Sequence, residues 1–316
     1  MMSAKHHAPS LMDHLPDVRG RLSADEPMAR YTWFKVGGNA EVLFRPADAD
    51  DLQNFLKGVP ADIKIGVIGN ASNLLVRDGG IPGVVIRLGS AFNQIRVEGQ
   101  ELIAGAGAAD FTVARTARDA SLAGLEFLSG IPGTIGGAVI MNGGAYGSEI
   151  SDICVSASFV DRLGHRHEIA AADLGFRYRH SDIEPSWIVT DVRLRGEAGD
   201  KLTITERMEK IQNEREITQP VRTPTGGSTF ANPPGHKAWQ LIDQAGCRGL
   251  KRGQAMVSDL HCNFLVNQGG ASASDLEGLG EEVRRRVFEH SGIRLDWEIR
   301  RIGIPGASGI KEIEHD

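Results

Sequence analysis

The stretch from residue 130 to residue 147, GIPGTIGGAVIMNGGAYG, holds seven glycines in eighteen residues. It is not a low-complexity linker, because Ile131, Ile135, Val139 and Met141 are interleaved among the glycines. Glycine lets a backbone approach a ligand closely and adopt positive φ, and successive free N–H groups form a concavity that suits phosphate oxygens. The stretch therefore indicates either a phosphate-binding loop or a tightly packed turn with no ligand. Taken alone, it leaves both interpretations open.

A second motif, GNASNLLV at residues 69–76, strengthens the ligand-binding interpretation. It leaves the strand-like run IKIGVI at 63–68 and combines Gly69 with Asn70, Ser72 and Asn73. Such short side chains hold an exposed loop through local hydrogen bonds, and they can also bind a diphosphate. A lone motif of this kind would more often be a turn than a site.

Length and composition limit the class of protein. A chain of 316 residues exceeds the size at which one core stops growing, so two or three lobes are expected. The net charge of −6, without a dense basic cluster, argues against nucleic-acid binding. Cys154, Cys247 and Cys262 form no C-x-x-C pair, so neither a disulfide framework nor a zinc site is expected. No apolar run reaches eighteen residues, which predicts a cytoplasmic protein without membrane insertion.

The order of the expected elements indicates a mixed α and β protein. Residues 1–20 read as a disordered tail, and the sequence GEAGD at 196–200 breaks the pattern before a second unit. Short apolar runs predict strands, and stretches with helical periodicity predict helices. The expected strands are 40–46, 63–68, 84–88, 101–107, 153–160 and 187–194, and the expected helices are 47–58, 110–123, a stretch that includes 202–211, and 274–287.

A dinucleotide-binding turn of the Rossmann type competes for the glycine signal. The sequence GAGAAD at 105–110 follows a strand-like run and precedes a helix. It departs from the fingerprint at the third glycine, where Asp110 stands, and a carboxylate there would oppose a pyrophosphate at the helix N-terminus. The Rossmann interpretation is therefore disfavoured.

Six blocks of sequence carry a resemblance to a known family. They are YTWFKVGGNAE (31–41), GNASNLLV (69–76), GLEFLSGIPGTIGGAVIMNGGAYG (124–147), FRYRHS (176–181), GGSTFANPPG (226–235) and LDWEIRRIG (295–303). In this order the chain resembles the UDP-N-acetylenolpyruvoylglucosamine reductase family, whose flavoenzymes catalyse the second step of peptidoglycan precursor synthesis. It looks closest to the shorter, second type, which lacks an extra substrate-covering loop.

The resemblance implies the fold and the cofactor. The implied fold is α+β: the FAD-binding fold of the vanillyl-alcohol oxidase/PCMH class, with two α+β subdomains, plus a C-terminal α+β substrate-binding domain. The implied domains are 21–198, split near 90–100, and 199–305, with a tail at 306–316. FAD would be bound non-covalently by two loops. The implied cofactor-binding residues are Gly69, Asn70, Ala71, Ser72, Asn73 and Leu74 in the first loop, and Gly130, Ile131, Pro132, Gly133, Thr134, Gly136, Gly137 and Ala138 in the second.

Three residues would then carry the reaction. In FRYRHS an extended segment would point Arg177 and Arg179 the same way, so the residues alone do not choose between them. The family pattern Tyr-Arg-x-Ser selects Arg179. By alternation alone Glu298 is a solvent-facing strand residue, and Ser228 is turn-forming, with Thr229 as its structural competitor. The resemblance instead makes Glu298 catalytic and Ser228 a proton donor.

The implied activity is reduction of an enolpyruvyl ether of UDP-N-acetylglucosamine to UDP-N-acetylmuramate. Hydride would pass from NADPH to FAD N5 and on to the substrate β-carbon, after which Ser228 would protonate the α-carbon. Arg179 would stabilise the enolate-like charge, and Glu298 is expected to be protonated or to act through a hydrogen bond. An FAD-dependent oxidase of an alcohol or lactone on the same fold is the alternative. Such oxidases often attach FAD through His or Cys, and neither loop contains one.

The resemblance also suggests further residues that would contact the substrate. Tyr178, Asn232 and His261 fall at or near positions that would contact the substrate, although a lone His on an apolar strand is more often a core residue. Arg177 stands where glycine is frequent in the family, and it adds a cation near the site. The expected partners are the UDP-sugar substrate and NADPH, with no nucleic acid, and the protein is expected to be a monomer without a metal site.

Overall fold

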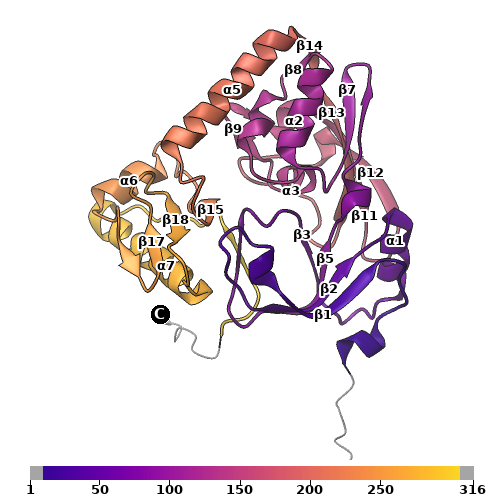
Figure 1. Ribbon diagram of the computed structural model, residues 1–316, viewed down its shortest axis with the longest axis horizontal. Coiled ribbons are helices and arrows are strands. Elements are labelled where there is room, and N and C mark those ends of the chain that lie inside the picture. Colours follow the sequence, from indigo (N-terminus) through magenta and orange to yellow (C-terminus); the bar gives the residue numbers. More distant parts are fainter. Residues whose placement is uncertain (1–9, 307–316) are drawn as a thin grey trace, which may run out of the picture.

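The computed structural model describes residues 10–306, and their helices and strands form three lobes (Figure 1). The chain passes from an N-terminal lobe around β1 and β2 to a second lobe that contains α2, and ends in a lobe that contains α6 and α7. The long helix α5 (Lys201–Thr218) connects the second lobe to the third. Mixed helices and strands confirm the predicted α+β class. Within residues 10–306, none of the helices combines the length and the apolar character needed to span a bilayer.

The N-terminal lobe is a four-stranded sheet in the order β1–β2–β5–β3. The strands β2, β5 and β3 are parallel, whereas β1 pairs with β2 in the antiparallel sense. Helix α1 crosses between β2 and β3, and it begins where the Asp48 carboxylate accepts a hydrogen bond from the Asp51 N–H at 2.9 Å. The bounds are β1 (Arg21–Pro27), β2 (Asn39–Arg45), α1 (Ala49–Gly58), β3 (Ile65–Ile68) and β5 (Ile81–Arg87), with short 3-10 helices η1 (Leu11–His14) and η2 (Met28–Arg30).

The segment before β1 packs against this lobe. Leu11, Met12, Leu15 and Val18 contact the cluster of buried side chains around Phe44 and Phe55. The backbone N–H groups of Arg19 and Gly20 donate to the two carboxylate oxygens of Asp51, at 2.8 and 2.9 Å. The prediction of a disordered tail up to residue 20 is therefore wrong for residues 10–20. No helical or strand periodicity marks residues 10–20, because the contacts that hold this segment are made with residues about 30 positions later in the chain. Residues 1–9, and residues 307–316 of the C-terminal tail, lie outside the described range.

The second lobe is a five-stranded antiparallel sheet in the order β12–β11–β13–β7–β6, with helices packed on it. Its strands are β6 (Ile95–Glu98), β7 (Glu101–Gly105), β11 (Cys154–Val160), β12 (Arg166–Ala170) and β13 (Ile188–Arg195). Its helices are α2 (Asp110–Asp119), α3 (Ile135–Ile140) and α4 (Ile150–Ile153), with 3-10 turns η3 (Ser90–Phe92), η4 (Glu126–Gly130) and η5 (Ala171–Asp173). Two-residue ladders join β8 (Leu122–Ala123) to β14 (Glu197–Ala198), and β9 (Gly144–Ala145) to β10 (Ser148–Glu149).

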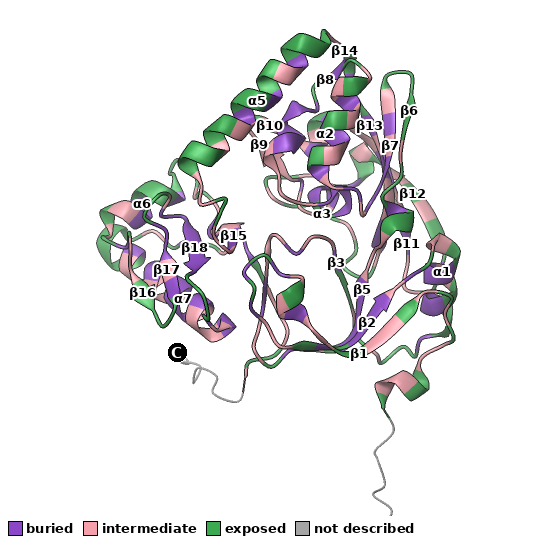
Figure 2. Ribbon diagram, in the orientation of Figure 1, coloured by how far each residue is buried: buried purple, intermediate pink, exposed green. Residues whose placement is uncertain are grey.

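The third lobe is a four-stranded sheet in the order β15–β18–β17–β16, packed against α6 and α7. Figure 2 shows that α5, which leads into it, is exposed along most of its length, and Ile204, Met208 and Ile211 form its buried contact. The bounds are β15 (Thr225–Ser228), α6 (Ala238–Gln244), β16 (Lys251–Arg252), β17 (Ala255–Val257), β18 (Phe264–Asn267) and α7 (Ala273–Ser291).

The end of the chain returns to the N-terminal half. Strand β19 (Arg300–Ile302) pairs in parallel with β4 (Leu74–Val76), directly after the first glycine-rich loop. The sequence predicts one half-buried strand through Glu298, but the segment 295–299 is not a strand and β19 begins only at Arg300. This pairing connects residues more than 200 positions apart, and it brings the C-terminal lobe against the loop at 69–74.

Candidate active site

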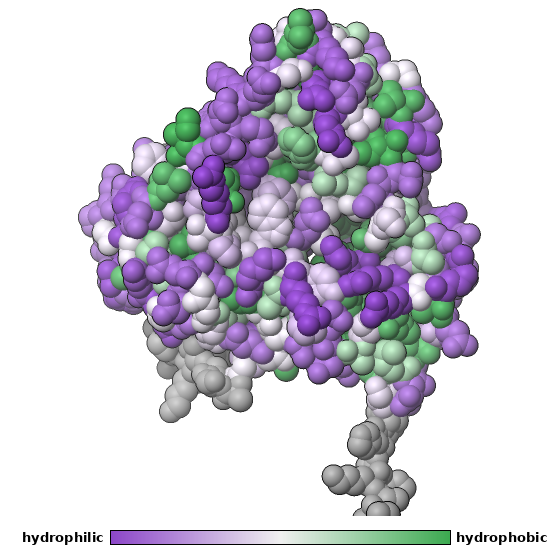
Figure 3. All heavy atoms as spheres, viewed as in Figure 1, coloured by the Kyte–Doolittle hydropathy of each residue, from purple (hydrophilic) through white to green (hydrophobic). Residues whose placement is uncertain are grey.

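A pocket of about 400 Å³ lies where the three lobes meet. Its lining comes from the loop at 69–74, from residues 130–145 of the second lobe, and from residues 219–228 and 298–300 of the C-terminal part. The space-filling view shows a hollow near the centre of the face drawn in Figure 3. Pockets of this size that are lined by several lobes are the usual location of small-molecule sites.

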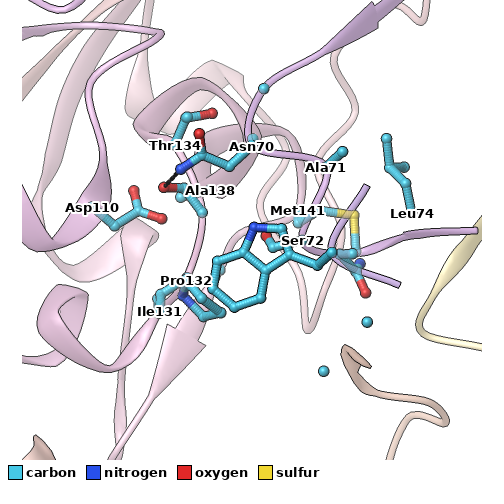
Figure 4. A pocket seen from close by; sticks show the side chains of 18 of the residues that line it. Asn70, Ala71, Ser72, Leu74, Asp110, Ile131, Pro132, Thr134, Ala138 and Met141 are labelled. Carbon is cyan, nitrogen blue, oxygen red and sulfur yellow. Dashed lines mark hydrogen bonds between the residues drawn. The ribbon is translucent and has the colours of Figure 1, made fainter. Parts of the chain in front are cut away.

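Both glycine-rich loops line this pocket. Every residue of these loops that the sequence predicts to bind the cofactor is part of the lining. Asn70 Nδ2 donates to the Gly133 carbonyl oxygen at 3.0 Å, so the two loops contact each other directly (Figure 4). A Cβ at position 69 would lie 2.2 Å from Thr134 Oγ1, and a Cβ at position 136 would lie 2.8 Å from the Ala106 Cβ. At these two positions the close approach of backbone requires glycine.

The residues of the pocket fit a dinucleotide cofactor such as FAD. Glycine at positions 69, 133 and 136 leaves the pocket wall as nearly bare backbone, which phosphate oxygens can approach. Asp110 borders the same loop with a fully buried side chain, and burial raises its pKa well above the ordinary value although the Gly133 backbone acts in the opposite direction.

Arg179 points into the pocket because its backbone makes a tight turn. The N–H and carbonyl groups of Arg177 and His180 bond each other, at 2.9 and 3.0 Å, and Arg179 has a φ of 53°. Positive φ in a non-glycine residue costs on the order of 1–3 kcal/mol. The turn sends Arg177 outward to the exposed carboxylate of Asp182, so the extended segment considered from the sequence is wrong. The turn therefore separates the two arginines.

Arg179 and Glu298 form an ion pair inside the pocket. Arg179 Nε donates to Glu298 Oε1 at 3.0 Å, and its Nη2 donates to the Gly144 carbonyl oxygen at 2.8 Å. The Glu298 side chain is only 17% exposed, and burial raises its pKa, although the charge and hydrogen bond of Arg179 act in the opposite direction. A raised pKa agrees with the expectation for Glu298. The solvent-facing position that alternation alone suggests is wrong.

Ser228 is the last residue of β15 and lines the pocket. Gly227, with a φ of 80°, precedes it, and Ser228 pairs with Phe264 of β18, which also lines the pocket. The neighbouring Thr229 is fully buried, and its Oγ1 accepts a hydrogen bond from the Leu265 N–H at 3.2 Å. Thr229 is thus engaged in the core of the lobe, whereas Ser228 lines the pocket.

The three residues suggested as further substrate contacts do not line this pocket. Tyr178 is 53% exposed and lies against Arg179, whose guanidinium carbon is 5.0 Å from the ring centroid. Asn232 Oδ1 accepts a hydrogen bond from the Ala238 N–H at 2.9 Å and so caps α6. His261 packs against the ring of Phe264, with 4.8 Å between the ring centroids, and burial lowers its pKa. Asn232 and His261 thus have structural contacts of their own.

Two arginines that the sequence did not single out also line the pocket. Arg215 of α5 is half-buried and its Nε donates a hydrogen bond to Gln219 Oε1 at 3.4 Å, whereas the side chain of Arg300 is exposed and makes no hydrogen bond or ion pair with the other residues between 10 and 306. Desolvation lowers the pKa of both groups. Arg300 lies two positions after Glu298, and this spacing could have identified it as a second residue of the same pocket. Arg215 lies on a long exposed helix, where nothing in the local pattern distinguishes it from surface charges.

Comparison with known proteins decides the family. A family model described as the C-terminal domain of UDP-N-acetylenolpyruvoylglucosamine reductase matches residues 219–302, and an FAD binding domain model matches residues 40–170. Proteins of that reductase name from Parvibaculum lavamentivorans and Rhodospirillum rubrum are 59% and 56% identical to the chain. The alignments cover 96% of this chain in both cases, and 98% and 97% of the two relatives.

The chain belongs to the UDP-N-acetylenolpyruvoylglucosamine reductase family. A crystal structure of the enzyme of this family from Thermus caldophilus is 36% identical, with a TM-score of 0.78, and the match covers 90% of this chain and 99% of that one. Together with the FAD binding domain at 40–170, this confirms the predicted FAD-binding fold, the flavoenzyme class and FAD as the cofactor.

Proposed function

We propose that the chain reduces UDP-N-acetyl-3-O-(1-carboxyvinyl)-glucosamine to UDP-N-acetylmuramate, with NADPH as the reductant, in peptidoglycan precursor synthesis. Family membership supports the reaction class, and the FAD binding domain supports the cofactor. One observation carries the assignment of the residues. Arg179, Ser228 and Glu298 come from three separate segments and line one pocket together with both glycine-rich loops.

The loops at 69–74 and 130–138 would hold FAD, and the rest of the pocket would hold the substrate. When bound, FAD supplies the hydride-transfer chemistry of the reaction. None of the lining residues in the described range is His or Cys, so the pocket offers no side chain of the kind that attaches a flavin covalently. Arg215, which is half-buried, and Arg300, which is exposed, are cations in the lining, and they suit the diphosphate of the UDP-sugar or a phosphate of NADPH.

Arg179 would bind the carboxylate of the enolpyruvyl group. Reduction of the double bond places negative charge towards that carboxylate, and a planar, permanently charged guanidinium can stabilise it. The turn at Arg179, its bond to the Gly144 carbonyl and its ion pair with Glu298 fix the guanidinium before the substrate arrives. Arg179 would therefore stabilise the negative charge on the substrate without reorganisation of its own side chain. Such preorganisation is the basis of electrostatic catalysis.

Ser228 would donate a proton to the α-carbon of the substrate. A hydroxyl of ordinary acidity can do this only when the carbanion is close and water is excluded. The positive φ of Gly227 turns the chain sharply just before Ser228, at the edge of the buried core around Thr229. The raised pKa of Glu298, caused by burial, would let this group share a proton with the substrate instead of opposing its growing negative charge.

The test is an anaerobic absorbance experiment with the purified protein. NADPH should bleach the flavin spectrum, and the enolpyruvyl UDP-sugar should restore it rapidly. If only dioxygen restores the spectrum, an oxidase on the same fold becomes the better assignment. If the protein binds no flavin after reconstitution, the assignment of the loops is wrong.

Ser228→Ala tests the proton donor within the same experiment. Flavin bleaching by NADPH should stay within about twofold of wild type, while the return of oxidised flavin on substrate addition should slow by about 10²-fold or more. The bleaching phase serves as the internal control. Equal loss in both phases would show that Ser228 shapes the pocket and does not donate the proton.

A further inference from the structure

Asn142 is a fully buried residue that the proposed mechanism does not use. It lies in the sequence between helix α3 and strand β9, and unlike its neighbours Met141 and Gly143 it does not line the pocket. Its φ of 42° lies in the left-handed region, which asparagine adopts more readily than most residues. Because Asn142 does not line the pocket, any effect on the reaction must act through other residues.

Both polar atoms of the Asn142 side chain are hydrogen-bonded to backbone. Nδ2 donates to the Arg177 carbonyl oxygen at 3.1 Å, and Oδ1 accepts from the Ser151 N–H at 2.9 Å. The Arg177 carbonyl oxygen also accepts from the His180 N–H at 3.0 Å, and this bond closes the turn that carries Arg179. The Asn142 amide therefore ties that turn to the segment before β9.

The turn needs such contacts because the backbone of Arg179 is strained. A non-glycine residue with a φ of 53° persists only where the surrounding structure holds it. Ser181 provides a second contact, since its Oγ donates to the Ile140 carbonyl oxygen at 2.8 Å. Asn142 binds the turn before Arg179 and Ser181 binds it after Arg179, so the chain is held on both sides of the strained residue.

The segment 142–144 also holds the guanidinium group of Arg179 directly. Arg179 Nη2 donates to the Gly144 carbonyl oxygen at 2.8 Å. A Cβ at position 144 would lie 3.1 Å from Arg179 Nη1, so glycine allows this close approach. Because Gly144 follows Asn142 by two residues, one short segment contacts both the backbone turn and the charged end of the same arginine.

We propose that Asn142 is a positioning residue for the reaction, whose amide holds the turn at 177–180 so that the Arg179 guanidinium meets the substrate carboxylate. The inference rests on the proposed function, in which Arg179 stabilises negative charge on the substrate. Loss of the amide would let the turn relax, and a displacement of about 1 Å can slow a reaction on the order of 10²-fold. Reduction of the flavin by NADPH does not use this charge, so only the second half-reaction should depend on Asn142.

The test follows both half-reactions of the holoenzyme by anaerobic stopped-flow absorbance. Asn142→Gly removes the amide without straining position 142, because glycine tolerates positive φ. Bleaching by NADPH should stay within about twofold of wild type, while the return of oxidised flavin at saturating UDP-sugar should slow by about 10- to 100-fold. Equal slowing of both phases would show that Asn142 only supports the fold of the lobe, and the proposal would be wrong.

A double-mutant cycle with Arg179→Ala separates an effect through Arg179 from an independent one. If Asn142 acts through Arg179, adding Asn142→Gly to Arg179→Ala should slow the return of oxidised flavin further by less than about threefold. A further loss of about 10-fold or more in that background would show that the two residues act independently, and would overturn the proposal.

Asn142→Asp is the second variant, for use if Asn142→Gly does not fold. Aspartate keeps the acceptor for the Ser151 N–H and tolerates positive φ, but a carboxylate cannot donate to the Arg177 carbonyl oxygen. The same difference between the two half-reactions is expected. A return of oxidised flavin at the wild-type rate in this variant would overturn the proposal.

Asn267→Gly is the matched control. Asn267 is also a buried amide outside the pocket lining: its Nδ2 donates to the Phe34 carbonyl oxygen at 2.9 Å, and its Oδ1 accepts from the N–H groups of Gly269 and Ala271. Both phases should stay within about twofold of wild type. If this control slows the return of oxidised flavin as much as Asn142→Gly does, the effect comes from loss of any buried amide and the proposal is wrong.

The wild-type trace distinguishes failure of this inference from failure of the proposed function. If oxidised flavin returns in the wild type and equally fast in Asn142→Gly, only the role of Asn142 is wrong. If the enolpyruvyl UDP-sugar does not restore the flavin spectrum of the wild type, the proposed function itself is wrong.

Discussion

Replacement of Glu277 should weaken the contact between the C-terminal lobe and the strand β4 that follows the loop at 69–74. Glu277 lies on α7 and accepts three hydrogen bonds: from Arg77 Nε at 3.0 Å, from Arg77 Nη2 at 2.8 Å and from Arg301 Nη1 at 3.0 Å. Arg77 directly follows β4, and Arg301 belongs to β19. These two strands carry Leu74 and Arg300 of the pocket lining. One carboxylate of the third lobe therefore holds both strands that border the site.

The size of the effect follows from burial and geometry. The side chain of Glu277 is 12% exposed, and those of Arg77 and Arg301 are 30% and 28% exposed. Breaking a buried ion pair by removing one partner costs about 3–5 kcal/mol. Because the two arginines are partly solvated, we expect Glu277→Ala to lower the free energy of unfolding by about 3 kcal/mol. Glu277→Gln keeps the shape but loses the charge, and about 2 kcal/mol is expected.

The pH dependence has a definite sign. Burial alone would raise the pKa of Glu277, but the hydrogen bonds and charges of Arg77 and Arg301 outweigh it and hold the pKa below its ordinary value. A carboxyl group whose pKa is lower in the folded state stabilises the fold above the unfolded-state pKa, about 4.3 for Glu. This contribution is lost as the pH falls through the folded-state pKa. Glu277→Gln should therefore lose less stability than wild type on acidification below about pH 4.3.

Urea unfolding followed by circular dichroism measures the stability, and flavin fluorescence measures FAD affinity in the same samples. Glu282→Ala is the control on the same helix, because its partners Arg285 and Arg286 are 55% and 37% exposed. Exposed pairs contribute about 0–1 kcal/mol, so this variant should change little. A loss below about 1 kcal/mol in Glu277→Ala, or an equal loss in Glu282→Ala, would refute the reasoning.

Three further predictions concern the pocket itself. Gly136→Ala places a Cβ 2.8 Å from the Ala106 Cβ and 3.0 Å from the Ala106 carbonyl oxygen, so FAD affinity measured by fluorescence titration should fall at least about fivefold, as expected for overpacking. Tyr178→Ala removes the ring at 5.0 Å from the Arg179 guanidinium, and kcat/KM should fall about two- to fivefold, whereas Tyr178→Phe should retain it. Arg177 is exposed and paired with Asp182, so Arg177→Ala should leave the KM for the UDP-sugar within about twofold.

Local chemistry explains why the two loops could be predicted from the sequence. A cluster of glycines among apolar residues has few uses other than close approach of backbone, and the contacts of Gly69 and Gly136 meet that requirement. The strands and helices around the loops follow from short-range apolar patterns, and most lie within a few residues of the predicted ranges.

The orientation of side chains in the site could not be predicted from local pattern. Whether Arg177 or Arg179 enters the pocket depends on one turn in which Arg179 adopts positive φ, a conformation that its sequence does not require. Glu298 is internal because it lies just before β19, which pairs with β4 more than 200 positions earlier in the chain. The full burial of Asp110 is likewise a property of the folded lobe that its local sequence does not indicate.

The backbone around Glu298 connects the loop expected to bind FAD with the segment that carries the expected proton donor. The Glu298 N–H donates to the Thr229 carbonyl oxygen at 2.9 Å, directly after Ser228, and the Glu298 carbonyl oxygen accepts from Asn73 Nδ2 at 3.1 Å, within the first glycine-rich loop. The Arg300 N–H in turn donates to the Asn73 carbonyl oxygen at 3.1 Å. Glu298 is thus held between the loop expected to bind FAD and the segment that carries the expected proton donor. A shift of the loop at 69–74 should therefore displace Glu298 and its ion pair with Arg179, so the loop expected to bind FAD also positions the charges that would meet the substrate.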